Sequence, residues 1–466
     1  MPPMTAFEKT TRRKIFYGLA ALFLLVAPLV ILHSRGYIVD LRSFNLVPTG
    51  GIFIKTVESG VRVFLDKNLA RETSFISRGA LISNLLPGRY TVRVEKEGYQ
   101  PWSKVVRVRD GEVIEFRSIF LPPATITPQA VFTAPRAAPA RLNGLAGRPE
   151  LILEAGEPEK PVTLSVVQPG IGQVSMRIAE VSQWRWDRIG SQFYFSRKRG
   201  EKTVWFRAPL GGSASPETRL TFRGLPAGFQ AEDIIPHPAR ANEFYFFAGG
   251  ALFLQTQASV PAPIAEQVHA YAVTQDRIYY VAKNGFFVAT SLEGRDTLVL
   301  GRKGLVLDEA RPAKFVAVPS GVVAVLDSAD GLFLYRPGVD QELQFITAGV
   351  DEVDFSQDGD RLVYWDEHRA WLYWVRDNRR QPFQLAGTRE QVLSTVDRIR
   401  RLFLDSDGTN LFYATPAGLH MSEADSRATP NTYDLLEAPV TDFLLEKNSL
   451  TLHWIEGKTL FRANLK

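Results

Sequence analysis

The chain of 466 residues is longer than one hydrophobic core usually supports, so two or more domains are expected. It contains no cysteine, which excludes disulfides, thiolate metal sites, iron–sulfur clusters and cysteine nucleophiles, while its 30 Phe and 35 Gly favour an all-β fold of short strands and turns. Of the net charge of +5, +3 lies in the first 14 residues, and the small remainder makes nucleic acid a poor candidate partner.

The first predicted element is a transmembrane helix at residues 15–32, IFYGLAALFLLVAPLVIL, which carries no charge and is just long enough to cross a hydrocarbon core of roughly 30 Å. Residues 1–14 form a basic tail before it, and the positive-inside bias then keeps the N-terminus cytoplasmic and exports the rest of the chain. His33 to Gly36 lack the small-residue pattern of a signal cleavage site. We therefore expect a single-pass cell-membrane protein rather than a cleaved signal peptide or a buried soluble helix.

Residues 33–49 are expected to be a juxtamembrane linker, and residues 50–123 a small β-sandwich. Tyr90, Val92 and Val94 alternate with polar residues, which indicates a strand with one buried and one wet face. The order of elements resembles that of a PEGA domain, a sandwich module of bacterial and archaeal envelope proteins. The resemblance rests on GVRVFLD (60–66), LPGRYTVRV (86–94), EGYQPW (97–102) and a closing strand to residue 121.

Two features of this PEGA-like segment bear on its role. The tetrapeptide that names the family is absent, because residues 58–61 read Glu-Ser-Gly-Val. Tyr99 and Trp102 are interpreted as an aromatic corner that closes the core, in preference to a ligand site. The segment is therefore expected to act as scaffold.

Residues 124–147 are rich in Pro and Ala and are expected to be a linker or the start of the next domain, which occupies residues 148–466. A unit of an apolar strand, a polar turn and an aromatic-rich strand recurs there about every 43 residues, the period of four-stranded propeller blades. The second strands of seven copies are anchored at Tyr194, Tyr245, Tyr279, Ala324, Tyr364, Tyr413 and His453, and residues 149–167 contain a degenerate eighth.

These repeats predict a β-propeller of seven or eight blades, in preference to an array of unrelated β-sandwiches. The copies FSQDGDRLVYW (355–365) and LDSDGTNLFY (404–413) resemble the WD40-like repeats of TolB-type propellers. The predicted fold class is thus all-β, with an N-terminal transmembrane helix, a PEGA-like sandwich and a propeller. The resemblance supports the architecture and names no partner.

No residue is predicted to be catalytic, to bind a cofactor or to hold a metal, because no nucleophile elbow or Walker loop occurs. No two histidines have the H-x-x-x-H spacing of a zinc site. The turns at Asp358 and Asp360 and at Asp405 and Asp407 lack the distal Glu of a calcium loop, so turn chemistry explains them better. The six histidines, all interpreted as ordinary strand or turn residues, are His33, His237, His269, His368, His420 and His453.

The basic clusters Arg197 to Arg199 and Arg379 to Arg380 fall in predicted hairpin tips and are either solvated or in contact with acidic envelope polymers. The predicted function is a non-enzymatic cell-envelope protein whose propeller binds or scaffolds protein or polysaccharide outside the membrane. The alternative is an extracytoplasmic propeller hydrolase acting on peptides or sugars, which calls for carboxylates and arginines at one mouth of the channel. A sensor is disfavoured because about 14 residues before the helix are too few for a signalling domain.

Overall fold

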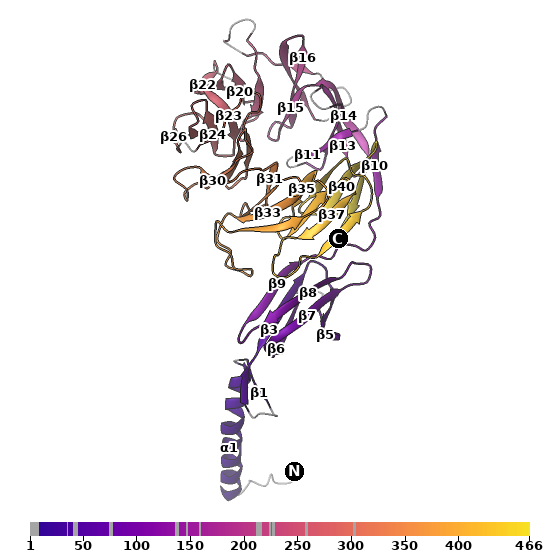
Figure 1. Ribbon diagram of the computed structural model, residues 1–466, viewed down its shortest axis with the longest axis vertical. Coiled ribbons are helices and arrows are strands. Elements are labelled where there is room, and N and C mark those ends of the chain that lie inside the picture. The colour runs from indigo at the N-terminus through magenta and orange to yellow at the C-terminus, as the bar shows by residue number, and fades with distance from the viewer. Residues whose placement is uncertain are drawn as a thin grey trace, which may run out of the picture. The chain divides into compact units, whose positions relative to one another are not determined.

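The fold is described from a computed structural model of the whole chain (Figure 1). It consists of two compact units, Met1–Ala124 and Thr125–Lys466, and each is described by itself. The described residues are 9–34, 36–40, 45–73, 78–135, 139–145, 148–157, 160–210, 217–222, 225, 229–256, 260–301 and 304–466.

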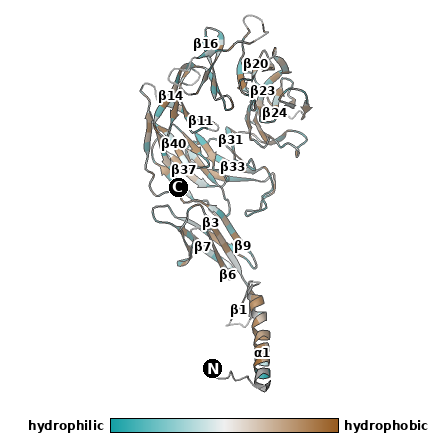
Figure 2. Cartoon of the chain, turned by 180° about the vertical axis from the view of Figure 1, so that it is seen from behind, coloured by the Kyte–Doolittle hydropathy of each residue, from teal (hydrophilic) through white to brown (hydrophobic). Residues whose placement is uncertain are grey.

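Helix α1 (Lys9–Ser34) opens the first unit. Its segment Arg13–Leu32, 20 residues, is long and apolar enough to cross a membrane, and none of it is buried inside the protein. Figure 2 shows this helix brown along most of its length, and Phe16, Leu24 and Leu25 are each more than 60% exposed. An exposed apolar surface of this kind is unfavourable in water and favourable in a lipid bilayer.

The segment expected to be a linker, residues 33–49, contains a short antiparallel hairpin of β1 (Tyr37–Asp40) and β2 (Asn45–Pro48). The Thr49 N–H and hydroxyl both donate to the carbonyl of Gly36, at 2.7 and 2.6 Å, and close the hairpin. Strands of four residues are too short to display a clear alternation of apolar and polar residues. The pattern therefore gave no sign of this hairpin.

Seven strands form the rest of the first unit as two sheets, ordered β6-β3-β9 and β5-β4-β7-β8, with β3 and β9 parallel. One hydrophobic core lies between the sheets, and Trp102 packs edge-on against Phe116 in it with ring centroids 5.1 Å apart. Trp102 is 1% exposed, and Tyr99 packs against the same core, as the scaffold interpretation predicts. The strands are β3 (Gly50–Thr56), β4 (Arg62–Leu65), β5 (Asn68–Glu72), β6 (Gly79–Leu85), β7 (Gly88–Glu95), β8 (Trp102–Val108) and β9 (Val113–Ile119).

The described residues of the second unit form eight antiparallel sheets of four strands, numbered here in the order of their first strands. Sheet 1 comprises β11 (Pro139–Gly144), β12 (Leu151–Ala155), β13 (Val162–Gln168) and β14 (Gln173–Val181), and sheet 2 comprises β15 (Gln183–Asp187), β16 (Gln192–Arg199), β17 (Lys202–Pro209) and β18 (Thr218–Arg219). Sheet 3 comprises β19 (Asp233–Pro236), β20 (Phe244–Ala248), β21 (Ala251–Gln255) and β22 (Ala262–Ala265). Sheet 4 comprises β23 (Val268–Val273), β24 (Arg277–Ala282), β25 (Phe287–Ser291) and β26 (Leu298–Val299).

Sheets 5 to 8 continue the same plan. Sheet 5 comprises β27 (Lys314–Ala317), β28 (Val323–Leu326), β29 (Leu332–Tyr335) and β30 (Gln344–Thr347), and sheet 6 comprises β31 (Glu352–Phe355), β32 (Arg361–Trp365), β33 (Arg369–Trp374) and β34 (Arg389–Ser394). Sheet 7 comprises β35 (Arg401–Leu404), β36 (Asn410–Ala414), β37 (Leu419–Glu423) and β38 (Thr432–Leu436). Sheet 8 comprises β39 (Asp442–Glu446), β40 (Thr451–Glu456), β41 (Thr459–Asn464) and, from the start of the second unit, β10 (Gln129–Thr133).

The eight sheets form a closed ring, because each packs against the next. Hydrophobic clusters join sheets 1 and 2, 2 and 3, 3 and 4, 4 and 5, 5 and 6, 6 and 7, and 8 and 1. Sheets 7 and 8 meet through Phe403 and Phe443, whose rings pack edge to face at 5.2 Å. The fold is a β-propeller, as predicted, and each sheet is one of its blades.

The repeat phase read from the sequence is confirmed. All seven anchor residues, from Tyr194 to His453, lie on the second strand of their sheets, and the degenerate eighth copy at residues 149–167 supplies β12 and β13 of sheet 1. A run of consecutive apolar and aromatic residues marks the second strand of a blade, which is buried on both faces, so this element is the easiest to recognise. The sequence left seven or eight blades open, and the described residues of the second unit form eight four-stranded sheets, so the propeller has eight blades.

Strand β10 closes the ring as the outermost strand of sheet 8, where it pairs antiparallel with β41. Residues 124–147, expected as a linker or the start of the propeller, thus contribute β10 to the last sheet and β11 to the first. The Thr133 and Thr459 hydroxyls lie 3.1 Å apart across this ladder. The edge strand is largely exposed, so its sequence lacks a strong apolar pattern.

Candidate functional site

The first strands of the sheets carry charged side chains that link one blade to the next. Arg185 on β15 forms an ion pair with Asp233 on β19 at 2.9 Å, and the Tyr271 hydroxyl on β23 donates to the same carboxylate oxygen at 3.0 Å. Burial, followed by the negative charge of Asp233, holds the pKa of Tyr271 well above its usual value. This phenol therefore stays protonated and remains a hydrogen-bond donor.

A second charged group joins sheets 6, 7 and 8. Asp354 accepts the backbone N–H of Leu404 at 3.0 Å and pairs with the Lys447 ammonium at 3.0 Å. Arg401 on β35 pairs with Asp442 on β39, whose carboxylate also accepts the backbone N–H of Leu142. Each of these carboxylates is held by donors from other sheets, which is the arrangement of an inter-blade clamp.

One pocket lies between sheets 1 and 2 and has a volume of about 980 Å³. One wall comes from β11, β12 and the turn before β13, and the other from β15, β16 and β17. The volume is at the upper end of the range for small-molecule sites, roughly 300–1,000 Å³. Its lining includes Arg141, Glu154, Lys160, Ser182, Trp184, Arg185, Trp186, Ser196 and Lys198.

Three residues that line this pocket each carry a buried polar atom without a hydrogen-bond partner among the described residues: Ser182 Oγ, Trp186 Nε1 and Ser196 Oγ. Ser196 is fully buried, at 0% exposure. Buried polar groups are nearly always satisfied in native proteins, because an unmade hydrogen bond costs free energy. These three atoms have almost no accessible surface, so a ligand that occupies the pocket does not reach them.

Some charged side chains of the pocket have a hydrogen-bond or ion-pair partner among the described residues, and others have none. Glu154 accepts hydrogen bonds from Asn143 at 2.8 Å and from the Trp184 indole at 3.0 Å, and Arg185 is engaged with Asp233. Arg141 and Lys198 line the pocket without an ion pair to any described residue. The uncompensated charges are therefore of both signs, because the two donors to Glu154 are neutral and leave its negative charge in place.

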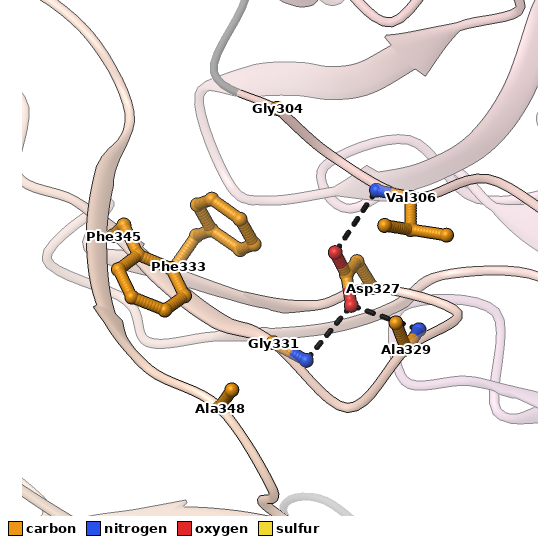
Figure 3. A pocket seen from close by; sticks show the side chains of 8 residues that line it. All are labelled: Gly304, Val306, Asp327, Ala329, Gly331, Phe333, Phe345 and Ala348. Atoms are coloured by element: carbon orange, nitrogen blue, oxygen red, sulfur yellow. Dashed lines mark hydrogen bonds between the residues drawn. The ribbon is translucent and has the colours of Figure 1, made fainter.

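Another pocket, smaller at about 490 Å³, lies on sheet 5 and is mainly apolar (Figure 3). Phe333 and Phe345 pack edge to face on one side, with centroids 5.2 Å apart. The Asp327 carboxylate points into the loop, where it accepts the backbone N–H groups of Val306, Ala329 and Gly331 at 2.8–3.0 Å (Figure 3). Because this carboxylate is already occupied, the pocket offers apolar surface and little polar chemistry.

The acidic turns singled out in the sequence surround a cation of the chain itself. Arg361, between sheets 6 and 7, donates to the Gly408 carbonyl at 2.5 Å and lies 4.4 Å from the centroid of Trp374. Burial lowers its pKa, and the carboxylates of both turns oppose this effect. Asp405 is itself occupied by Thr409 and Asn410. The turns thus clamp two blades together.

The histidines and basic clusters lie apart from one another in the propeller. No three His, Asp or Glu side chains in the described ranges group closely enough to hold a metal ion, and the side chain of His33 falls outside those ranges. Arg197 is paired with Glu217 at 2.6 Å, whereas its neighbour Lys198 faces the larger pocket. Arg379 and Arg380 lie in the connection between β33 and β34.

Sequence patterns did not single out the pocket residues Ser182, Trp186 and Ser196. A serine or tryptophan in a strand carries no mark of an unpaired polar atom, because pairing depends on which groups the neighbouring sheet supplies. The only signal was the basic cluster at residues 197–199, which supplies Lys198 to the pocket.

Comparison with known proteins identifies one domain. The PEGA domain family matches residues 49–122. No curated protein matches the chain. Among solved structures, one similar chain is the computationally designed Ika8 protein, with 12% identity and a TM-score of 0.46, and the match covers 72% of this chain and 99% of that one. Another is the β-propeller domain of Cps50 (Swd1) from Myceliophteria thermophila, with 11% identity and a TM-score of 0.42, and the match covers 73% of this chain and 100% of that one. Residues 49–122 are a PEGA domain, and the chain carries it between an N-terminal apolar helix and a β-propeller of eight sheets.

Proposed function

We propose that this chain is a non-enzymatic cell-envelope protein that is held by α1 in the membrane and binds a protein or glycan outside it through its propeller. The observation that carries the proposal is the pocket of about 980 Å³ between sheets 1 and 2, whose lining includes the partly buried Trp184 and the exposed cations Arg141 and Lys198. A pocket between stiff sheets is well suited to binding, because its side chains are already ordered before the ligand arrives.

The proposed topology is supported by charge and by exposed apolar area. Four Lys or Arg residues stand among the first 14 residues, and Arg13–Leu32 is apolar and unburied. The positive-inside bias places such a tail in the cytoplasm, so the PEGA domain and the propeller belong on the outer side. PEGA domains are of an extracytoplasmic type, in agreement with this orientation.

The ring architecture supports binding in preference to chemistry. The carboxylates of Asp233, Asp354 and Asp442 are each engaged by a cation or a backbone N–H of a neighbouring sheet. Such groups hold the frame in place, and a hydrolase would need carboxylates free to exchange protons with a substrate.

The topology is tested by adding protease to intact cells. Cleavage of the propeller by external protease is expected, whereas full protection in cells that degrade a known external marker would contradict the orientation. Leu24→Arg provides the matched variant, because a charge near the middle of a membrane helix costs about 2.5–3.5 kcal/mol and should weaken membrane retention.

Binding is tested by capturing partners of the full chain from native envelope extract. Wild type and Lys202→Glu are expected to recover the same protein or glycan, and Lys198→Glu, which reverses a charge in the pocket, is expected to recover less. Equal recovery by all three would remove the pocket from the proposal. Release of cleaved peptide or sugar products would favour the hydrolase.

A further inference from the structure

We infer that the hairpin of β1 and β2 lies in the headgroup layer of the outer leaflet, with the side chains of Tyr37 and Leu46 in contact with lipid. This inference rests on the proposed function, because it takes α1 as a membrane span, and it adds a second surface through which the chain contacts the bilayer. It is drawn from the position of the hairpin beside α1, from its exposed apolar face, and from the bonds that tie its base to the PEGA domain.

The hairpin lies where the proposed span leaves the hydrocarbon core. The apolar segment ends at Leu32 and α1 ends at Ser34, and two more helical residues advance the chain by only about 3 Å. Gly36 then has a φ of +80°, a left-handed conformation that commonly ends a helix, and β1 lies beside α1 (Figure 1). Because the headgroup layer is roughly 5–8 Å thick on each side of the core, the hairpin begins within it.

One face of the hairpin presents apolar side chains that no part of the chain covers fully. Leu46 pairs with the backbone of Val39, two residues after Tyr37, so Tyr37 and Leu46 share a face of the pleated ribbon. Their side chains are 38% and 48% exposed. A tyrosine is favoured at a membrane interface, because its ring is apolar and its hydroxyl is polar. Contact with lipid would also stabilise the hairpin, since an isolated two-stranded ribbon is only marginally stable in water.

The base of the hairpin is bonded to the PEGA domain. Thr49, which closes the hairpin, accepts the backbone N–H of Gly111 at 3.1 Å, in the turn between β8 and β9. Gly51 donates to the carbonyl of Glu112 in the same turn at 2.9 Å, and a Cβ added at Gly50 would lie 2.6 and 2.7 Å from two carbonyl oxygens of this turn. The backbones are thus packed closely, and a hairpin held among the headgroups fixes the height of the PEGA domain above the membrane.

The size of the exposed face favours lipid over another protein. Two side chains present far less than the roughly 800 Å² that each partner buries in a stable protein interface. Lipid needs no such area, because α1 already holds the hairpin at the bilayer and so makes the second contact intramolecular in effect. The occupant of this face is therefore the outer leaflet itself.

The test uses a nitroxide label in the full chain, which has no cysteine of its own. Leu46→Cys is labelled and reconstituted into phosphatidylcholine vesicles. Electron paramagnetic resonance then compares collisions of the label with oxygen, which dissolves in lipid, and with a water-soluble nickel chelate. Val105→Cys, at a 56% exposed position of β8, is the matched control. Collisions with nickel are expected to be about threefold or more rarer at Leu46→Cys, and collisions with oxygen more frequent, because lipid excludes the chelate.

A second variant tests what the contact does for the hairpin. Tyr37→Ser with Leu46→Ser removes the apolar face and leaves α1 intact. Amide hydrogen exchange of β1 and β2 in the same vesicles should be about tenfold faster than in wild type, because the hairpin loses its cover, and Val105→Ser should leave it unchanged. All three proteins should resist extraction with alkaline carbonate equally, since α1 supplies the anchor.

Each alternative has its own outcome. Equal nickel collisions at both labels, in a chain that resists carbonate extraction, overturn the inference and leave the proposed anchor in place. Few collisions with either reagent at Leu46→Cys, with dipolar broadening that disappears on dilution with unlabelled chain, overturn it in favour of a second copy. Few collisions without broadening place this residue against the chain itself and also overturn it. If carbonate extracts the wild-type chain, the anchor and the inference both fail.

Discussion

Asp442 accepts the backbone N–H of Leu142 at 2.8 Å and thereby ties the inner strand of sheet 8 to the inner strand of sheet 1. The same carboxylate pairs with Arg401 of sheet 7, and it is only 7% exposed. Three sheets therefore depend on one side chain at the seam of the ring.

Asp442→Ala is expected to destabilise the propeller by roughly 3 kcal/mol, because it leaves the partly buried Arg401 guanidinium without its counter-charge and the buried N–H of Leu142 without its acceptor. Urea unfolding of the full chain followed by tryptophan fluorescence measures the loss. Glu437→Ala, at an exposed site, is the control and should be near neutral. A loss below about 1 kcal/mol for Asp442→Ala would show that the seam holds without this carboxylate.

A disulfide at the closure of the ring should stabilise the propeller. Thr133 and Thr459 are paired across β10 and β41, their hydroxyls lie 3.1 Å apart, and 326 positions separate them in sequence. The chain has no other cysteine, so Thr133→Cys with Thr459→Cys gives a single possible bridge. Closing so long a loop is expected to contribute about 3–5 kcal/mol.

The measurement compares the thermal midpoint of the oxidised double variant with that of the same protein after reduction. Gel mobility without reductant shows whether the bridge has formed. A bridge that forms but leaves the midpoint unchanged would mean that β10 separates from β41 only after the rest of the ring has unfolded.

Glu58 makes the PEGA domain sensitive to pH. One of its carboxylate oxygens accepts the backbone N–H of Leu121 at 3.3 Å, and the other, Oε1, has no partner among the described residues. Burial raises the pKa of this carboxyl from 4.5 to about 7, against the opposing hydrogen bonds from the backbone. The folded state therefore binds the proton more tightly than the unfolded chain does.

Because the pKa is higher in the folded state, the contribution of Glu58 to the stability of the domain is largest below pH 4.5. This contribution falls as the pH rises from 4.5 to about 7, and it changes little above pH 7. Amide hydrogen exchange of β3 and β9, corrected for its intrinsic pH dependence, measures the change. Glu58→Gln should abolish the slope and Glu72→Gln, at an exposed site, should keep it. Equal protection of wild type at pH 5 and pH 8 would contradict this assignment.

Arg361 explains the acidic turns at residues 358–360 and 405–407 without a metal. Its guanidinium bonds to Gly408 of sheet 7 and stacks on Trp374 of sheet 6. Arg361→Met should cost roughly 3 kcal/mol, because it leaves the surrounding carboxylates without their cation. The thermal midpoint of wild type should be the same in calcium and in EDTA, and a rise in calcium would restore the metal-loop interpretation.

The sequence predicted elements whose signal is local. Tyr194, Tyr245 and Tyr413 lie in strands that are apolar over several consecutive residues, so the second strand of a blade stands out, and its recurrence predicted the propeller. Strand β10 was not distinguished from a linker, because its partner β41 lies more than 300 positions away and no local pattern records that pairing.

The candidate site was less accessible to sequence reasoning for the same reason. Ser196 Oγ and Trp186 Nε1 have no hydrogen-bond partner among the described residues, and no sequence pattern records this, because pairing depends on which groups the neighbouring strands supply. Lys198 was noted as one of a basic run, but its neighbour Arg197 is taken up by Glu217, which a charge run does not reveal. Whether a charged residue is free or paired is a property of the assembled sheets.

The place of β10 in the chain has a mechanical consequence. It is the first strand after the PEGA domain, with residues 123–128 between residue 122 and the strand, and it is also the strand that closes the ring. In a chain tethered by its N-terminal helix, tension from a bound ligand travels along the backbone through β10 before it reaches the tether. Within the propeller, the ladder between β10 and β41 is therefore the first to bear this load, and its strength sets the force at which the ring opens.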